Sequence, residues 1–183
     1  YGHCQFRAFA PCVRRGRYAF QPLIDAMKPP RLDSYDIAIL RALQSDGRMT
    51  KVALAEAVNL SPSPCWERLK KLEQAGYITG YLAKVDIKKI ASVTEVMVEV
   101  TLSGHKADDF RRFETMMDDC QEVQACWALG GGVDYLLRLV VSDVDAYQRF
   151  MDALLDGDAG IERYFGYIVT KTVKNAPPAI PEA

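Results

Sequence analysis

An α+β protein with two folded domains is predicted by three features of the sequence. Helical periodicity and helix-capping residues run from residue 33 to residue 75, a strict apolar alternation follows at residues 96–102, and strand and helix patterns then alternate. The first feature is typical of a small helical domain, and the other two are typical of a sheet with helices on one face. We therefore expect domains at residues 31–81 and 94–174, joined by a linker at residues 82–93.

Both ends of the chain are expected to lie outside these domains. Residues 1–30 lack sustained periodicity and end in a Lys-Pro-Pro run that cannot continue a helix, so they are predicted to be a disordered or appended extension. The tail at residues 175–183, NAPPAIPEA, is predicted to be flexible. The alternative for the N-terminal extension is a basic arm in which three arginines contact phosphates: Arg14, Arg15 and Arg17.

Composition and charge narrow the class of protein. The net charge is -1, but residues 31–81 carry seven basic and six acidic side chains, whereas residues 82–183 carry eleven basic and seventeen acidic ones. No apolar run reaches the roughly 18 residues of a membrane span, the five cysteines include no C-x-x-C pair, and the two histidines are far apart. No nucleophile-elbow, zinc-protease or phosphate-loop motif is present. These features predict a cytoplasmic protein that is not an enzyme and holds neither a metal nor a cofactor.

The first two predicted helices are short and carry clear end signals. Asp33 caps the first helix, with Asp36 in the capping-box position, and Gly47 ends it. Thr50 caps the second helix, and Asn59 is a residue type tolerated in the left-handed turn that would end it. The side chains predicted to be buried are Ile37, Leu40 and Leu43 in the first helix and Val52, Ala55 and Val58 in the second.

A doubled Ser-Pro opens the third helix, which is predicted at about residues 62 to 75. Ser61 is a favourable N-cap, and Pro62 and Pro64 both fall in the first turn, where N–H groups have no partner within the helix. Gly76 supplies the C-terminal end. The two prolines therefore start this helix rather than break it.

The third helix has two faces of different chemistry, with Arg68 on the flank between them. The inward face holds Cys65, Leu69 and Leu72, and the outward face holds Ser63, Glu67, Lys70, Lys71 and Gln74. Three short helices with such an outward face are typical of a helix-turn-helix, in which the lysines and Arg68 reach phosphates or guanine and Glu67 accepts from cytosine. The alternative is that Glu67 pairs with Lys70 or Lys71 on a merely solvated face.

The second domain is predicted to have the β-α-β-β-α-β order of a ferredoxin-like sheet with two helices on one face. Its first strand alternates apolar residues at Val96, Val98, Val100 and Leu102. The remaining segments are a helix at 107–119, strands at 123–130 and 133–142 around a glycine turn, a helix from Asp143 and a strand at 161–173.

Three stretches together resemble the Lrp/AsnC family of bacterial and archaeal transcription regulators: LDSYDIAILRALQSDGRMT, LAEAVNLSPSPCWERLKKLEQAGYITGY and GGGVDYLLRLVV. The resemblance covers about residues 31 to 175. It implies a winged helix-turn-helix domain that binds double-stranded operator DNA and a ferredoxin-like domain that binds an amino acid or related small effector and forms homodimers, tetramers or octamers. The positions expected to contact DNA are Thr50, Ser61, Ser63, Pro64, Glu67, Arg68, Lys70 and Lys71.

The resemblance also implies an effector site at the contact between dimers. The residues expected there are Gly130, Gly131, Gly132, Asp134 and Tyr135, with Val144, Tyr167, Ile168 and Val169 beside them. Their chemistry suits an amino acid, because the glycines expose N–H groups to a carboxylate, Asp134 can receive an ammonium group, and Val144 and Ile168 can line an apolar slot. The alternative is a plain hairpin turn, since glycines suit a tight reversal between strands.

The predicted function is a sequence-specific DNA-binding regulator that controls amino-acid metabolism genes and acts at the nucleoid. One alternative is an architectural protein that wraps DNA without responding to a ligand, and the ratio of specific to non-specific affinity would distinguish it. A more distant alternative is an amino-acid-binding enzyme subunit whose helices do not contact DNA. The polar outward face of the third helix argues against that alternative.

Overall fold

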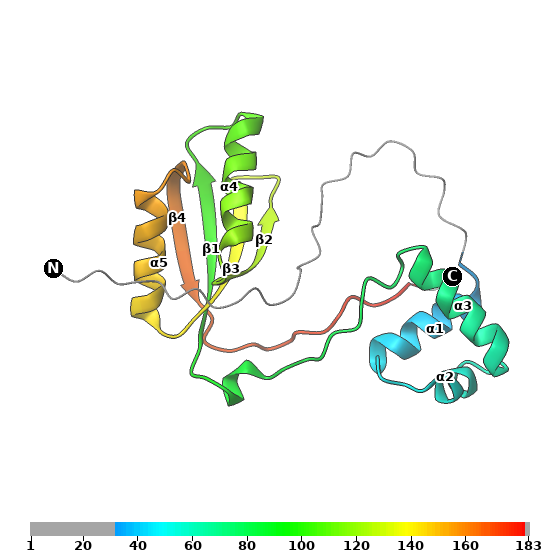
Figure 1. The fold of residues 1–183 in the computed structure, drawn as a ribbon. Coiled ribbons are helices and arrows are strands. Elements are labelled where there is room, and N and C mark those ends of the chain that lie inside the picture. The colour runs from blue at the N-terminus through cyan, green and yellow to red at the C-terminus, as the bar shows by residue number, and fades with distance from the viewer. Residues whose placement is uncertain (1–31, 182–183) are drawn as a thin grey trace. The chain divides into compact units, whose positions relative to one another are not determined.

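The computed structural model describes residues 32–181, which form two compact units (Figure 1). Of the described residues, the first unit holds Leu32 to Gly80 together with those from Ala179, and the second unit runs from Tyr81 to Pro178. The predicted N-terminal extension, residues 1–30, lies outside the described residues. No helix in the described part of the chain is long and apolar enough to cross a membrane.

Within the described residues, the first unit holds three helices: α1 (Ser34–Ser45), α2 (Lys51–Ala57) and α3 (Pro62–Gln74). Each helix packs against the other two. The side chains buried where they meet are Ile39, Leu54, Ala55, Val58, Cys65, Leu69 and Leu72. The predicted inward face of α3 is therefore confirmed.

Helix α1 begins as the sequence predicts and buries the predicted Ile37, but it also buries a residue that was not predicted. Asp33 Oδ1 accepts the N–H of Asp36 at 2.9 Å, and Asp36 Oδ2 accepts the N–H of Asp33 at 3.2 Å, which completes the expected capping box. Ile39 is fully buried, whereas Leu40 and Leu43 are only half-buried. Because α1 packs against two helices, its buried face is wider than the single stripe that was predicted.

The inward face of α2 corrects one prediction. Thr50 is the expected cap, because its Oγ1 accepts a backbone N–H of the first turn at 3.1 Å. Val52 is 55% exposed, however, and Leu54 is buried in its place beside Ala55 and Val58. At about 100° per residue, residues 54, 55 and 58 share one side of the helix and residue 52 falls well outside it.

A tight turn joins α2 to α3. Asn59 has a φ of 54°, so it adopts the predicted left-handed conformation. The N–H of Leu60 donates to the carbonyl of Ala55 at 2.9 Å and the N–H of Asn59 donates to Glu56 at 3.2 Å, which is the Schellman pattern for a helix end. Ser61 is then the N-cap residue of α3, although its side chain makes no capping hydrogen bond.

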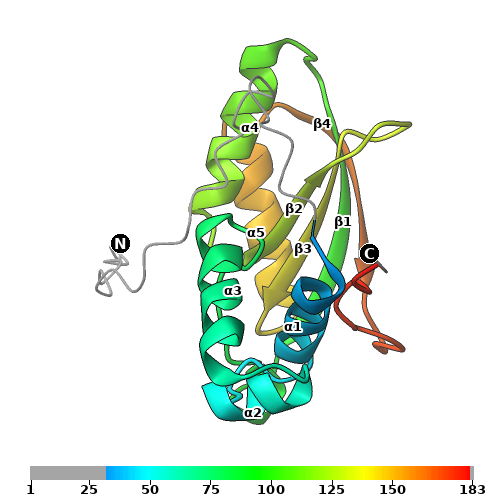
Figure 2. The ribbon, with the colours of Figure 1, turned by 90° about the vertical axis from the view of Figure 1, so that its right-hand side faces the viewer.

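The second unit has the predicted ferredoxin-like order. Its elements are β1 (Thr94–Leu102), α4 (Ala107–Asp119), β2 (Val123–Ala128), β3 (Tyr135–Val141), α5 (Val144–Asp156) and β4 (Ile161–Ile168). The strands form an antiparallel sheet in the order β2-β3-β1-β4. Helices α4 and α5 cover one face of this sheet and leave the other face uncovered (Figure 2).

Strand β1 lies inside the sheet and supplies much of the core. Every second residue from 96 to 102 is at most 1% exposed, as the alternation predicts. Leu137 and Leu139 of β3 are buried beside them, and Phe113 of α4 and Met151 of α5 pack onto the same cluster. This packing fixes which face of the sheet is closed and which is open.

The segments before β1 and after β4 contain little regular structure. The linker holds one short 3-10 turn, η1 (Ile87–Lys89). Strand β4 ends at Ile168 rather than at residue 173, and residues 169–181 have no regular secondary structure. Arg41 Nη2 of α1 donates to the carbonyl of Ile180 at 3.1 Å, so the end of the described tail lies against the first unit.

We predict that Asn59→Ala lowers the free energy of unfolding of the first unit by about 1 kcal/mol, because a residue with an ordinary Cβ is disfavoured in the left-handed region. Asn59→Gly should leave that free energy unchanged or raise it. Urea unfolding followed by Trp66 fluorescence in a Trp127→Phe background reports on this unit alone, because the chain has two tryptophans. Asn175→Ala, the same change in the tail, is the control. Equal stability of Asn59→Ala and the wild type would contradict this account of the turn.

Candidate DNA-binding surface and effector site

The outward face of α3 presents polar side chains that are not bound within the unit. Ser63, Glu67, Lys70, Lys71 and Gln74 are all exposed. Among the described residues, no ion pair joins Glu67 to Lys70 or Lys71, so the alternative of a self-paired helix face does not describe this surface. These groups are available for hydrogen bonds and ion pairs with a bound molecule.

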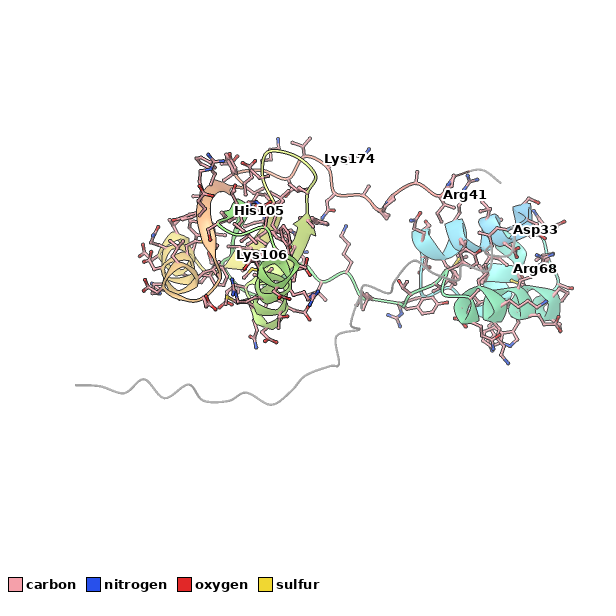
Figure 3. The ribbon with its side chains drawn as sticks, turned by 90° about the horizontal axis from the view of Figure 1, so that it is seen from above. Asp33, Arg41, Arg68, His105, Lys106 and Lys174 are labelled. Atoms are coloured by element: carbon pink, nitrogen blue, oxygen red, sulfur yellow. The ribbon has the colours of Figure 1, made fainter. Side chains whose placement is uncertain are left out.

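Arg68 differs from the other basic residues of α3 because it is paired within the unit. Its Nη1 lies 2.7 Å from Asp33 Oδ2 and 2.8 Å from Asp36 Oδ1 (Figure 3). Its guanidinium carbon also lies 5.5 Å from the centre of the Tyr35 ring. Arg68, which the sequence predicted as a DNA contact, thus ties α3 to the N-terminal end of α1 and holds the outward face in a set direction.

The ion pairs of Arg68 with Asp33 and Asp36 favour the charged forms of Arg68 and Asp33. The pKa of Asp33 is lowered from its ordinary value by the hydrogen bond from the Asp36 N–H and by the Arg68 guanidinium. Hydrogen bonds to Asp36 and Asp33 in turn raise the pKa of Arg68. Because the Asp33 side chain is 47% exposed, its pairing with Arg68 is worth about 0.5 kcal/mol, as for other surface ion pairs.

The other predicted DNA contacts surround the start of α3. Ser61 and Pro64 are exposed in or before its first turn. Thr50 uses its hydroxyl to cap α2, and the next residue, Lys51, holds its Nζ 3.3 Å from the centre of the Trp66 ring. Lys51 was missed by the sequence analysis. Only the packing of α2 against α3 places this cation beside the outward face.

The loop between β2 and β3 carries the three predicted glycines in an open conformation. None of Gly130, Gly131 and Gly132 has a left-handed φ, and a Cβ added to any of them would meet nothing within 4 Å. All three are exposed. Neither the turn nor the packing of a single chain therefore requires glycine here, and the backbone of the loop is accessible to a ligand or to another copy.

Asp134 is held in place just before β3. Its Oδ2 accepts the N–H of Leu102 at 2.8 Å and lies 3.3 Å from His105 Nε2. Its own N–H donates to the carbonyl of Val100 at 3.0 Å. Oδ1 has no partner among the described residues, so the fixed carboxylate can accept one further hydrogen bond.

Tyr135 belongs to the core rather than to a ligand surface. It is 2% exposed, its ring centre lies 4.6 Å from that of Phe113, and its hydroxyl donates to Glu114 Oε1 at 2.9 Å. Burial and the Glu114 carboxylate raise the pKa of Tyr135. The expected effector contact by this side chain is thus corrected, since Tyr135 instead anchors the strand that follows Asp134.

The other predicted effector residues fall into two groups at opposite ends of the sheet. The glycine loop and Asp134 lie before the start of β3. The second group lies beyond the end of β3 or at the end of β4: Val144, Tyr167, Ile168 and Val169. Across β1, Ile168 is level with Leu139, four residues along β3 from Tyr135, so the groups are at least about 13 Å apart. A small effector that contacts both groups must lie between two copies of the chain.

The uncovered face of the sheet carries large apolar and aromatic side chains beside three charged ones: Glu95 and Glu99 of β1 and Arg138 of β3. Trp127, Phe165 and Tyr167 are 46%, 49% and 51% exposed, and Met97 and Leu136 are half-buried. The strand pairing places Trp127 opposite Leu136 and Tyr167 opposite Met97 on this face. A patch of large apolar side chains of this kind is typical of a surface that binds another protein chain.

A helix-turn-helix unit with a free outward face, joined to a ferredoxin-like unit with an open loop, defines a class of DNA-binding transcription regulators with a ligand-binding domain. Residues 32–79 match the winged helix-turn-helix DNA-binding family, and residues 95–179 match the Lrp/AsnC ligand binding domain. The chain belongs to the Lrp/AsnC family of transcriptional regulators, and proteins of this family are not enzymes.

Relatives match along most of their length. The transcriptional regulatory protein DoeX of Halomonas elongata is 51% identical over 150 residues, which cover 82% of this chain and 95% of that protein. The leucine-responsive regulatory protein of Escherichia coli is 36% identical over 156 residues, or 84% of this chain and 95% of that protein. A transcriptional regulator from Neisseria meningitidis, solved in complex with L-Met, has a TM-score of 0.75 and 36% identity over 80% of this chain and 94% of that chain.

We predict that Asp33→Asn lowers the free energy of unfolding of the first unit by about 0.5 kcal/mol at neutral pH, because asparagine keeps the capping acceptor but loses the ion pair with Arg68. The pKa of Asp33 is lowered in the folded state, so this stabilisation is present above the unfolded pKa and is lost as the pH falls below about 4. Urea unfolding followed by Trp66 fluorescence across this range measures it. Asp118→Asn in α4 is the control, and a difference that stays constant down to about pH 2 would contradict the assignment.

Proposed function

We propose that this protein is a sequence-specific DNA-binding regulator that responds to an amino acid or a related small metabolite. The observation that carries the proposal is the outward face of α3, whose polar and basic side chains are free while its inward face is buried. A dimer would present two α3 helices to successive major grooves about 34–36 Å apart, on an imperfect palindrome. Likeness to the leucine-responsive regulatory protein supports amino-acid metabolism genes as the targets.

The side chains of α3 suit both kinds of DNA contact. Lys70 and Lys71 can neutralise phosphates or donate to guanine, and Glu67 can accept from a cytosine amine. Arg68 contributes indirectly, because its pairing keeps α3 at a fixed angle to α1. The residues that would approach the DNA backbone around the start of α3 are Thr50, Lys51, Ser61, Ser63 and Pro64.

For the effector, the arrangement favours an amino acid held between copies of the protein. The open glycine loop offers backbone N–H groups to a carboxylate, and Oδ1 of Asp134 offers an acceptor to an ammonium group. Val144 and Ile168 are 51% and 50% exposed and can line an apolar slot. Because the two groups lie at opposite ends of one sheet, one copy would supply the polar group and another the apolar group. The L-Met bound to the Neisseria meningitidis regulator supports a ligand of this class.

The uncovered sheet face supports a homodimer, and contacts between dimers would build a tetramer or octamer. Pairing two such faces would remove Trp127, Phe165 and Tyr167 from water. An effector bound between dimers would favour one assembly over another and so change the spacing of the α3 helices along DNA. This coupling requires only that the effector binds the two assemblies with different affinities.

A nuclease footprint on the DNA upstream of the gene for this protein tests the proposed function. We expect a short protected palindrome whose protection changes with one member of an amino-acid pool. Long, phased protection that is indifferent to every amino acid would instead identify an architectural DNA-wrapping protein. No protection at low salt would contradict DNA binding altogether.

On the protected fragment, Lys71→Ala is expected to weaken binding to all sequences and to reduce the slope of log affinity against log salt by about one unit per bound copy, because each phosphate contact releases counterions. Fluorescence anisotropy titrations at several salt concentrations measure the slope. Lys106→Ala, which removes the same charge from the ferredoxin-like unit, should leave it unchanged. An unaltered slope for Lys71→Ala would remove this residue from the phosphate contacts.

Asp134→Asn is expected to abolish the amino-acid response while DNA binding persists. Asparagine keeps an acceptor for the Leu102 N–H but cannot pair electrostatically with an ammonium group. Operator binding titrated with the responsive amino acid measures the effect, and Asp158→Asn, an exposed carboxylate elsewhere in the unit, is the matched control. A wild-type response from Asp134→Asn would exclude the proposed ammonium contact.

A further inference from the structure

We propose that two segments of the second unit, residues 81–93 and 169–178, bind DNA phosphates on either side of the site that α3 reads. We call them the basic connectors. This inference rests on the proposed function, because α3 must first hold a duplex nearby. The connectors would add contacts that do not depend on base sequence and that lie outside the helix-turn-helix unit.

Charge is sharply divided between the connectors and the sheet unit they flank. The connectors carry one acidic residue, Asp86, and five lysines: Lys84, Lys88, Lys89, Lys171 and Lys174. Residues 94–168, which lie between them, carry fifteen acidic and six basic side chains. The folded sheet unit therefore repels a polyanion, and the segments nearest in sequence to the DNA-binding unit attract one.

The five connector lysines are free to act on a partner. All are exposed, and within the part of the chain that the structure describes none forms an ion pair. Asp86 uses a carboxylate oxygen to accept the backbone N–H of Lys88 at 3.2 Å, where it caps η1. Three arginines of the sheet unit are in contrast paired with its own carboxylates: Arg111, Arg112 and Arg138.

The chain holds both connectors close to the DNA-binding unit. Lys84 follows Gly80, the last residue of that unit before the linker, by four residues, which span at most about 14 Å. At the other end, Ile180 accepts a hydrogen bond from Arg41 of α1 at 3.1 Å, and Lys174 precedes it by six residues, or at most about 22 Å. Duplex DNA carries one negative charge per roughly 1.7 Å of axis, so a duplex held by α3 that passes within this reach would offer phosphates to these lysines.

The competing partner for these lysines is the acidic sheet unit of another copy. DNA is favoured because its charge is continuous and dense, whereas the carboxylates of a folded surface occupy fixed and separate positions. Lysine suits such a target, since its ammonium is a point charge on a flexible stem. The linker also exposes Leu82, Val85 and Ile90, at 98%, 63% and 70%, and these apolar groups can serve contacts between copies without using the lysines.

Two variants and two duplexes test the proposal. The full-length variants are Lys84→Gln/Lys88→Gln/Lys89→Gln and the same protein with Lys171→Gln/Lys174→Gln added. The duplexes are the footprinted palindrome alone and the palindrome extended by about 15 base pairs on each side, long enough to pass the connectors. Anisotropy titrations at several salt concentrations give the affinity and the salt slope for each pair.

On the extended duplex, we expect the triple variant to lose about three units of salt slope per bound copy and the quintuple variant four to five units per bound copy, since each phosphate contact contributes roughly 0.9. At about 0.15 M salt this corresponds to roughly fivefold in affinity per lysine. On the short duplex the losses should be much smaller, because few flanking phosphates are present. The specificity for the palindrome should rise, since only the sequence-independent contacts are removed.

The control is Lys106→Gln/Arg111→Gln/Arg149→Gln, which removes three positive charges from exposed positions on α4 and α5 or beside them. It should leave the slope unchanged on both duplexes. Sedimentation velocity without DNA compares the oligomeric state of every variant with that of the wild type. A wild-type salt slope for the quintuple variant on the extended duplex would overturn the proposal. If the oligomeric state of that variant were altered at the same time, the lysines would be assigned to contacts with another copy.

The same titrations distinguish a loss of DNA binding by the whole protein from an absence of contacts by the connectors. If the wild type binds neither duplex, the proposed DNA-binding function fails and the connector proposal fails with it. If the wild type binds both duplexes and Lys71→Ala reduces the slope while the connector variants do not, only the connector proposal fails.

Discussion

The outward face of α3 depends on how firmly the rest of the helix is held. Cys65, Leu69 and Leu72 are buried against α1 and α2, but burial alone is not directional. Arg68 adds direction, because its contacts of 2.7 and 2.8 Å with two carboxylates tie one flank of α3 to the start of α1. A helix that reads DNA needs a rigid backbone and free side chains. In α3, the inward face packs against the other two helices, Arg68 on the flank forms the ion pairs, and the side chains of the outward face stay free.

In the second unit, strand β1 is the element that determines which surfaces are buried and which are exposed. Its alternate residues are buried under α4 and α5, so the intervening residues face an open surface with Trp127, Phe165 and Tyr167. The same sheet separates the glycine loop from Val144 and Ile168 by its own length. One chain therefore exposes an apolar surface suited to pairing and two separate halves of a candidate site. In our proposal, assembly and effector recognition are linked because the effector needs more than one copy.

Charged side chains are unevenly distributed between the segments of the chain. A net charge of -1 conceals an acidic sheet unit flanked by lysine-bearing segments and attached to a helical unit with unpaired lysines on one face. In our proposal, the acidic surface keeps DNA away from the sheet unit, while the connectors and α3 attract it. Most of the fold and part of this site could be predicted from local pattern. The caps at Asp33 and Thr50, the left-handed Asn59 and the alternation of β1 each depend on residues only a few positions apart.

The sequence by itself determined the starts of the helices, the succession of helices and strands along the chain and the division of α3 into two faces, because hydrogen bonds and periodicity within one element specify them. Tertiary structure alone decided which side chains meet across elements. Ile39 and Leu54 are buried, Val52 is not, Arg68 is paired with carboxylates more than thirty residues away, and Tyr135 is packed under α4. A local pattern states that a helix or strand has an apolar side. It does not indicate which other helix or strand that side will pack against. The hydrogen-bonding partners of Arg68 and of the Tyr135 hydroxyl depend on that packing.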